Sequence, residues 1–266
     1  MFCNQCEQTA KGTGCTVMGV CGKNEAVAGL EDLLTHAVQG LCLVAAAGLK
    51  VGVVDRGVDR FTCEAIFSCL TNVDFDPGRF ETLIRKTVEL REALKKKVLA
   101  AGGKIESTAP AATFSPADTL AGLEAQGAAL NFINTLDANP DLQSLKQITM
   151  YGLRGLAAYT DHAAILGKED ETVYAYIHEA MGELTRKDLG LDQLVGLALK
   201  CGEVNLKAME LLDAGNTGTY GHPVPTPVPL GENYSCKEHG DESIDLSPVT
   251  GYRFGGGIPQ ARHRRE

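Results

Sequence analysis

Four cysteines near the N-terminus have the residue type and spacing of a metal-binding site. Cys3, Cys6, Cys15 and Cys21 follow the pattern C-x2-C-x8-C-x5-C. Thiolates are ligands of both zinc and iron–sulfur clusters. The C-x2-C pair allows two thiolates to reach one metal group from a single tight loop, and the two later cysteines can close the site. We therefore predict that residues 1–23 form a metal-binding loop.

The ligand set narrows the kind of metal group. No histidine precedes His36, so the four thiolates would supply all the ligands. Structural zinc sites more often combine two C-x2–4-C pairs, whereas this sequence has one, so the spacing favours an iron–sulfur cluster over zinc. A zinc-stabilised helical scaffold is the alternative, and a disulfide pair is the least favoured. Glycine backbone N–H groups can approach cluster sulfides, and four glycines lie between or directly after the cysteines: Gly12, Gly14, Gly19 and Gly22.

Composition bounds the class of protein. The chain has 266 residues, of which 44% are hydrophobic and 22% charged, as in a soluble globular protein of one or two domains. The net charge of -9 argues against a nucleic-acid partner, because phosphate binding requires a basic surface. Four of the nine cysteines lie within the first 21 residues, and this clustering differs from the even spread of a disulfide scaffold.

The N-terminus shows no secretory signal, and the apolar segment Leu41–Val54 contains Lys50 and is too short to span a bilayer. We therefore expect a cytoplasmic protein without a membrane partner, in which thiols stay reduced and available to metals. Four later cysteines are expected to be buried as small hydrophobic residues: Cys42, Cys63, Cys69 and Cys201.

Hydrophobic periodicity after the cysteine loop predicts an all-α fold. Apolar residues recur every three or four positions, and several segments begin with a cap residue or a cap followed by proline, as at Asp76-Pro77 and Asn139-Pro140. The final helix is expected to stop at Gly215-Asn216. The predicted helices begin after Asn24, cover 60–70, run from Pro77 to Gly102, cover 118–134, run from Pro140 to Gly167, and cover 171–184 and 191–212.

We expect two helical bundles, at residues 24–110 and 111–221, because the Pro- and Ala-containing segment 104–117 is typical of a linker. Residues 222–266 carry alternating prolines and no apolar periodicity, which predicts an irregular tail. His178-Glu179 starts like the zinc-protease pattern H-E-x-x-H, but Gly182 replaces the second histidine. We interpret that pair as part of a half-exposed helix face.

The chain opens with MFCNQCEQTAKGTGCTVMGVCGK, and LEDLLTHAVQGL follows soon after it. These two segments resemble the N-terminus and the first long helix of the hybrid-cluster (prismane) family of hydroxylamine reductases. The later segments LRGLAAYTDHAAILG and CGEVNLKAMELLDAGNTGTYGHP also resemble family sequences, so the similarity runs from residue 1 to about residue 230. The cysteine spacing resembles the family branch with a [4Fe–4S] cluster, which implies Cys3, Cys6, Cys15 and Cys21 as its ligands.

The resemblance implies a reductase. In that family, electrons from a redox partner protein pass through the N-terminal cluster to a hybrid [4Fe–2O–2S] cluster, which reduces hydroxylamine to ammonia and water, or acts on nitric oxide. Two further α/β domains supply the ligands of the hybrid cluster, and no position here matches them. We therefore expect the N-terminal helical domain of such a protein, truncated near residue 231 and followed by an unrelated or out-of-frame tail. The alternative is a non-catalytic electron-transfer or iron–sulfur binding module.

Overall fold

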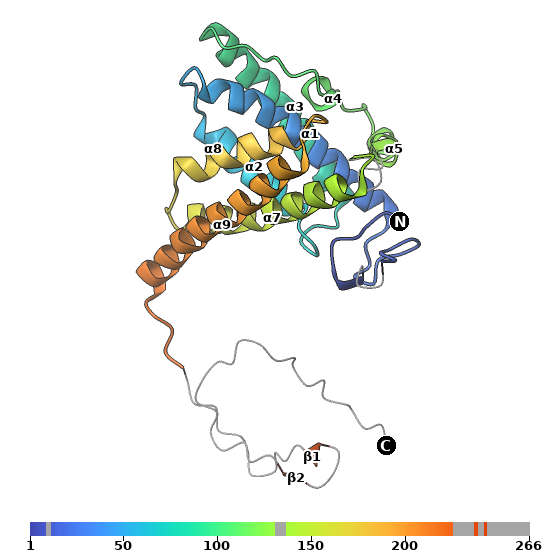
Figure 1. Ribbon diagram of the computed structural model, residues 1–266, viewed down its shortest axis with the longest axis vertical. Helices are drawn as coiled ribbons and strands as arrows, with labels where there is room; N and C mark the ends of the chain where they lie inside the picture. The colour runs from blue at the N-terminus through green and yellow to red at the C-terminus, as the bar shows by residue number, and fades with distance from the viewer. Residues whose placement is uncertain (9–11, 131–136, 226–236, 239–241, 244–266) are drawn as a thin grey trace. The chain divides into compact units, whose positions relative to one another are not determined.

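The computed structural model describes residues 1–8, 12–130, 137–225, 237–238 and 242–243. These residues form an almost entirely helical fold (Figure 1), so the predicted all-α class is confirmed for them. A pair of two-residue antiparallel strands, β1 (Lys237–Glu238) and β2 (Glu242–Ser243), is the exception. The helices are α1 (Glu25–Leu49), α2 (Arg56–Ser68), α3 (Pro77–Ala100), α4 (Pro110–Thr113), α5 (Leu120–Leu130), α7 (Pro140–Ile165), α8 (Glu171–Glu183) and α9 (Leu191–Tyr220).

Side-chain caps begin most of the long helices. The side chains of Asn24, Asp76, Asn139 and Asp170 each accept a hydrogen bond from a backbone N–H in the first turn of the helix that follows. Such caps satisfy backbone donors that have no partner within the helix, which is why these starts were predictable from sequence. Asp55 caps α2 in the same way, and α2 therefore begins four residues before the predicted start at residue 60.

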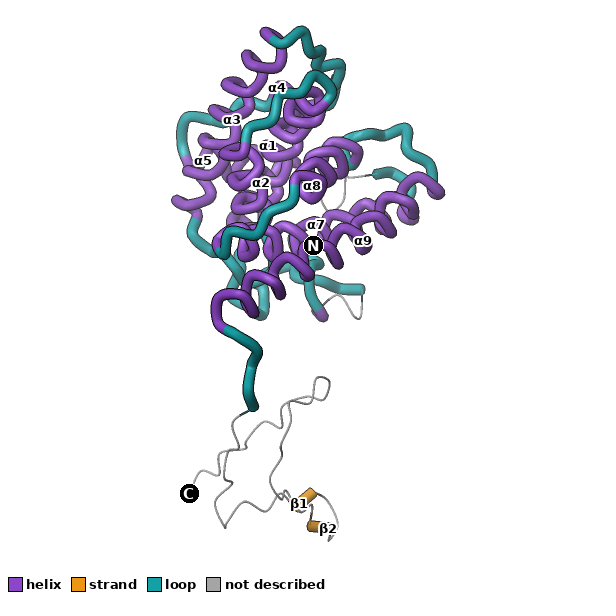
Figure 2. The backbone as a smooth tube through the Cα atoms, turned by 90° about the vertical axis from the view of Figure 1, so that its left-hand side faces the viewer, coloured by secondary structure: helices purple, strands orange, loops and turns teal. Residues whose placement is uncertain are grey.

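Helix α1 lies at the centre of the helical part of the chain and contacts α2, α3, α4, α5 and α8 (Figures 1 and 2). Leu30, Leu34 and Leu41 on this helix are fully buried. Among the described residues, α1 is the one helix long and apolar enough to cross a membrane, with a mean hydropathy of 1.4 in its most apolar window. Since 67% of that window is buried by neighbouring helices, α1 has the character of a core helix.

The expected division into two bundles at residue 110 is not observed. The described residues between 1 and 219 form one compact unit. The main core of this unit is continuous from Leu30 and Phe80 before residue 110 to Leu153 and Ile177 after it. The boundary fails because α1 packs against helices from both halves of the chain, so the larger hydrophobic cluster spans residue 110. A smaller cluster around Leu41, Val58 and Leu94 lies entirely before it.

The segment expected to be a linker is partly helical and tied to the core. Helix α4 lies within residues 104–117 and packs against α1. The buried Arg91 guanidinium donates hydrogen bonds to the backbone carbonyls of Ala111 at 3.1 Å and Phe114 at 2.8 Å. The Arg91 side chain on α3 therefore holds residues 104–117 in place. The composition of this segment alone had predicted a linker.

Helix α9 is longer than predicted. It continues through Gly215 to Tyr220, and Gly221 follows with a φ of +79°. A Cβ atom on Gly215 would lie 3.0 Å from Cβ of Leu166, so this glycine allows close packing within the helix and does not end it. The expectation of an irregular tail concerns residues that lie mostly outside the described part of the chain.

Two glycines allow α1 and α5 to meet backbone to backbone. A Cβ atom on Gly127 would lie 2.3 Å from the carbonyl oxygen of Gly29, and a Cβ atom on Gly29 would lie 3.3 Å from backbone atoms of α5. Helices separated by larger side chains normally pack 8–10 Å apart. The α1–α5 contact thus depends on the absence of side chains at this crossing.

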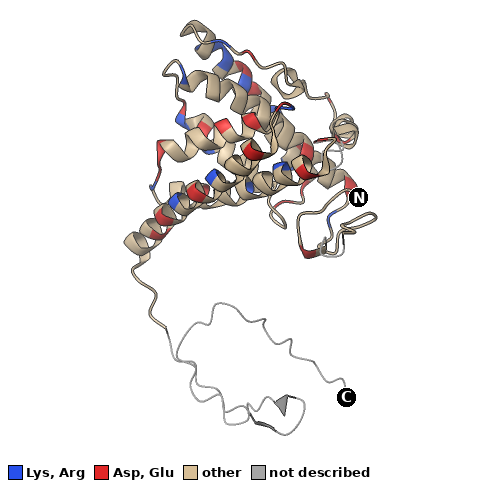
Figure 3. Cartoon of the chain, in the orientation of Figure 1, with Lys and Arg blue, Asp and Glu red and all other residues tan. Residues whose placement is uncertain are grey.

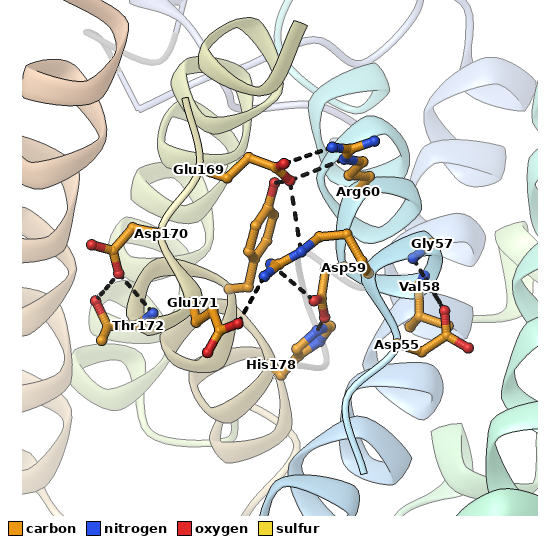
Figure 4. A network of polar contacts seen from close by, with 12 residues as sticks. Asp55, Gly57, Val58, Asp59, Arg60, Glu169, Asp170, Glu171, Thr172 and His178 are labelled. Atoms are coloured by element: carbon orange, nitrogen blue, oxygen red, sulfur yellow. Dashed lines mark hydrogen bonds and ion pairs between the residues drawn. The ribbon is translucent and has the colours of Figure 1, made fainter. Parts of the chain in front are cut away.

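A polar network joins α2 to α8 and to the connection between α7 and α8 (Figure 4). Nε2 of the buried His178 lies 2.9 Å from Oδ1 of Asp59, so this histidine is held inside the fold and is not half-exposed as expected. Arg60 donates two hydrogen bonds to Glu169, and the Tyr174 hydroxyl donates a third at 2.8 Å. Elsewhere acidic and basic residues follow one another along α9 (Figure 3).

Glu169 should make the stability of the fold depend on pH in the acidic range. Hydrogen bonds from Arg60 and Tyr174 lower the pKa of this carboxyl from 4.5 to about 2. Its stabilising effect is therefore complete above pH 4.5 and is lost as the pH falls toward 2. We expect Glu169→Gln to lower the free energy of unfolding by about 1–2 kcal/mol at pH 7, with the difference from the wild type shrinking in urea titrations below pH 4.

The matched control is Glu171→Gln, because Glu171 also contacts an arginine, Arg56, but its side chain is 79% exposed. This substitution should lower the unfolding free energy by less than Glu169→Gln does, because an exposed ion pair contributes little. A Glu169→Gln deficit that is the same at pH 7 and pH 3 would contradict the assigned ionisation.

Gly127→Ala should destabilise the α1–α5 crossing. The added methyl group would overlap the Gly29 carbonyl, so the helices must separate, and overpacking of this kind costs about 1–3 kcal/mol. Thermal unfolding and urea titration measure the effect. Gly196→Ala on the exposed side of α9 is the control, since no atom lies within 4 Å of its added Cβ. That variant should be as stable as the wild type or more so; equal stability of both variants would rule out the close crossing.

Candidate metal centre

The four predicted ligand cysteines line one cavity. This cavity has a volume of about 410 Å³ and is bordered by Cys3, Cys6, Cys15 and Cys21. Its remaining lining comes from other residues of the N-terminal loop and from the connection between α2 and α3: Gln5, Glu7, Gln8, Gly19, Val20, Lys23, Thr71 and Asn72. The fold thus brings together all four cysteines that the spacing singled out.

A short backbone bridge sets the first half of the loop. The N–H of Cys15 donates to the carbonyl of Cys3 at 2.8 Å, and the N–H of Phe2 donates to the carbonyl of Cys15 at 2.9 Å. Gly14 precedes the bridge with a φ of +47°, and a Cβ atom there would lie 2.7 Å from the Cys3 carbonyl oxygen. Only glycine therefore fits beside this pairing, which holds the first and third cysteines next to each other.

A tight turn sets the second half of the loop. The N–H of Gly19 donates to the carbonyl of Lys23 at 2.7 Å, and the N–H of Gly22 donates to the carbonyl of Gly19 at 2.8 Å. A Cβ atom on Gly19 would lie 3.1 Å from Sγ of Cys21. The missing side chain leaves room for the sulfur at the cavity wall, whereas the N–H of Gly19 is already bound to the Lys23 carbonyl.

The cysteines differ in exposure. Cys3 and Cys15 are half-buried, whereas Cys6 and Cys21 are exposed, and none of the eight cysteines in the described part of the chain forms a disulfide. Burial raises the pKa of the Cys3 thiol, and a coordinated metal reverses this effect because its positive charge stabilises the thiolate. Within the described residues, no three Cys, His, Asp or Glu side chains form a group as tight as a single metal ion requires.

Polar contacts attach the cysteine loop to the helices. The Asn4 amide donates to Gln147 at 2.9 Å, and the Tyr151 hydroxyl donates to the Asn4 amide oxygen, which connects the loop to α7. The Thr71 hydroxyl donates to the Gln5 amide oxygen at 3.1 Å, which connects the loop to the segment after α2. The residue after Cys3 and the residue before Cys6 are thereby held by different parts of the fold.

A buried ion pair connects the cavity to α1. The Lys23 Nζ lies 2.5 Å from Oε1 of Glu31, and the two side chains are only 2% and 1% exposed. Gln5 donates a hydrogen bond to the other carboxylate oxygen at 3.2 Å. Burial raises the pKa of Glu31, while the positive charges of Lys23 and Arg154 oppose this rise.

The sequence-based reasoning did not identify Lys23 or Glu31. One signal was available: Glu31 lies in the apolar stretch of the first helix, next to Leu30 and four residues after Val27. A carboxylate on a buried helix face requires a cation or a donor nearby. The partner itself was not predictable, because it comes from an irregular loop.

The later cysteines behave as expected. Cys42, Cys63, Cys69 and Cys201 are at most 4% exposed and belong to the main hydrophobic core. Burial raises the pKa of each thiol, to about 12 for Cys69. None of these four lines the cavity at the N-terminus. They are structural hydrophobic residues, as predicted.

Comparison with known proteins identifies the family. The profile of the Prismane/CO dehydrogenase family matches residues 1–236. This chain belongs to that family. Proteins named hydroxylamine reductase from Syntrophobacter fumaroxidans and Maridesulfovibrio salexigens are 59% and 55% identical to it over 97% and 87% of its length. The matches cover 48% and 42% of those proteins, so the chain spans about half the length of these curated relatives.

The comparisons also correct the expectation of an unrelated tail. The match with the Syntrophobacter protein extends over 260 residues and therefore passes well beyond residue 231. A hydroxylamine reductase from Trichormus variabilis is 42% identical over 99% of this chain. Similarity to the family therefore continues after residue 231, although the tail lacks the apolar periodicity on which the expectation was based.

Cys15→Ser tests the ligand assignment. A serine hydroxyl is a poor substitute for a thiolate, so this variant should lose the bound metal and the visible absorbance of anaerobically purified protein. Metal analysis and absorption spectroscopy measure the loss. Cys201→Ala is the control, because Cys201 is buried away from the cavity, and it should retain the metal content of the wild type. An unchanged spectrum after Cys15→Ser would refute the assignment.

Proposed function

We propose that Cys3, Cys6, Cys15 and Cys21 hold a [4Fe–4S] cluster, and that this chain is the electron-transfer part of a hydroxylamine reductase. The observation that carries the proposal is that all four cysteines line a single cavity. Membership of the Prismane/CO dehydrogenase family and similarity to proteins named hydroxylamine reductase support it.

The cavity fits a cluster better than a single zinc ion. Zinc bonds four thiolates at about 2.3 Å, which draws the sulfurs tightly around one atom. The four cysteines here are instead four of the twelve residues that line a cavity of about 410 Å³. In the described part of the chain, no three Cys, His, Asp or Glu side chains lie close enough together to hold a single metal ion. The donor set of four thiolates also suits an iron–sulfur cluster.

When bound, such a cluster accepts and donates single electrons. The chain's own residues hold it in place and set its surroundings. The bridge between Cys3 and Cys15 and the contacts of Asn4 and Gln5 with the helices restrict movement of the loop. Exposure of Cys6 and Cys21 leaves one side of the site open to an electron donor. We propose a redox partner protein as that donor.

In the proposed scheme, the reduction of hydroxylamine requires a second metal centre besides the cluster held by Cys3, Cys6, Cys15 and Cys21. Reduction of hydroxylamine consumes two electrons and two protons and yields ammonia and water. We propose that hydroxylamine, or nitric oxide as a related substrate, reacts at a hybrid [4Fe–2O–2S] cluster expected only in a full-length family member. We further propose a cytoplasmic setting, with neither nucleic acid nor membrane as a partner.

A non-catalytic iron–sulfur electron-transfer module is the second candidate. In the part of the chain that the structure describes, one cavity is lined by cysteines, and the other cysteines are buried in the core. A chain with one cluster site can exchange electrons, whereas hydroxylamine reduction in the proposed scheme requires a second metal centre. This candidate and the first share the same cluster and differ in whether this chain turns over substrate.

The deciding experiment is iron and sulfide analysis of anaerobically purified protein, combined with EPR and a hydroxylamine assay with a reduced dye. Four irons and four sulfides per chain with a cubane EPR signal would support the proposed cluster. If that protein does not turn over hydroxylamine, it is the electron-transfer module. If it turns over hydroxylamine and shows a second EPR signal, it is a hydroxylamine reductase. Colourless protein that contains zinc and no iron would overturn both.

A further inference from the structure

The buried ion pair between Lys23 and Glu31 lies directly beside the cysteine cavity. Lys23 lines the cavity and follows Cys21 by two residues, while Glu31 lies behind it on α1. We infer that this pair sets the reduction potential of the bound cluster, with Lys23 favouring the reduced state and Glu31 opposing it. The inference rests on the proposed function, because it requires a cluster in the cavity.

Burial makes the charge of Lys23 effective. Its ammonium group is shielded from water, lies 2.5 Å from Glu31, and sits 5.7 Å from the centre of the Phe75 ring. Solvent and salt strongly weaken interactions between exposed charges but weaken those of buried charges much less. A fixed positive charge at the wall of the cavity should therefore stabilise an electron added to a cluster held by four thiolates.

Glu31 is shared between two cations. Arg154 on α7 is 3% exposed, and its charge, like that of Lys23, acts on the Glu31 carboxylate. One guanidinium nitrogen of Arg154 donates to Thr35 at 3.3 Å, whereas Nε and Nη1 have no hydrogen-bond partner in the described structure. The three buried side chains thus carry a net charge of +1 when all are ionised, and neutralising Glu31 leaves two uncompensated cations.

The direction of the potential shift separates this role from a purely structural one. An ion pair that only fastens the loop would loosen it when either partner is removed, so both substitutions would have the same effect. An electrostatic role predicts opposite shifts, because Lys23→Met removes a positive charge and Glu31→Gln removes a negative one. Lys23→Arg keeps the charge and should keep the potential.

The experiment is a redox titration of the reconstituted full chain, monitored by EPR at one fixed pH. At the midpoint potential of the wild type, we expect the ratio of reduced to oxidised cluster to fall about tenfold in Lys23→Met and to rise about tenfold in Glu31→Gln. A tenfold change corresponds to a midpoint shift of about 59 mV for a one-electron couple. The double variant should lie between the two single variants.

The matched controls are Lys200→Met and Glu203→Gln. These residues form an ion pair of similar length, 2.7 Å, but their side chains are 52% and 69% exposed on α9. Both controls should keep the wild-type potential. If Lys23→Met fails to bind iron, Glu31→Gln, which has nearly the same side-chain volume, decides the question. Shifts of the same sign, or no shift in Glu31→Gln, would overturn the inference.

Failure of the inference is distinguishable from failure of the proposed function. Iron and sulfide analysis precedes the titration, and wild-type protein that binds no cluster overturns the proposed function and this inference together. Wild-type protein with a full cluster but unaltered potentials in Lys23→Met and Glu31→Gln leaves the proposed function intact and overturns the inference alone.

Discussion

Burial of α1 is the constraint on which the rest of the structure depends. This helix packs against five others, and its leucines form the centre of a core that joins residues from both halves of the chain. Polar groups at such a position are costly unless they are paired. Glu31 is therefore bound to Lys23 and Gln5, and this requirement connects the hydrophobic core directly to the cysteine loop.

The loop itself has little regular structure. Its shape depends on one backbone bridge, one tight turn and side-chain contacts with α1, α7 and the segment after α2. A metal group bound by four thiolates would add covalent bonds to this framework and join its two halves. The folding of the helices and the geometry of the site are thus linked through a small number of polar residues.

Family membership and the geometry of the cavity give the same picture of the N-terminal site. The relatives named hydroxylamine reductase are about twice as long as this chain. The described structure accounts for a helical unit with one cysteine-lined cavity. Under the proposed function, the helical unit would position and insulate an electron-carrying centre, and the buried charges beside that centre would set its reduction potential.

The sequence alone predicted those features that depend on interactions between residues close together in the chain. Cap residues such as Asp76 and Asn139 marked helix starts because they satisfy backbone donors nearby, and the spacing of Cys3, Cys6, Cys15 and Cys21 predicted the site because a short loop limits where thiolates can reach. Only the tertiary structure decided that the main core joins both halves of the chain, that Gly215 packs against Leu166 instead of ending α9, and that Lys23 pairs with Glu31. These features depend on contacts between segments far apart in the chain, or on a loop without hydrophobic periodicity. Such contacts and such loops leave no repeating pattern in the local sequence from which they could be predicted.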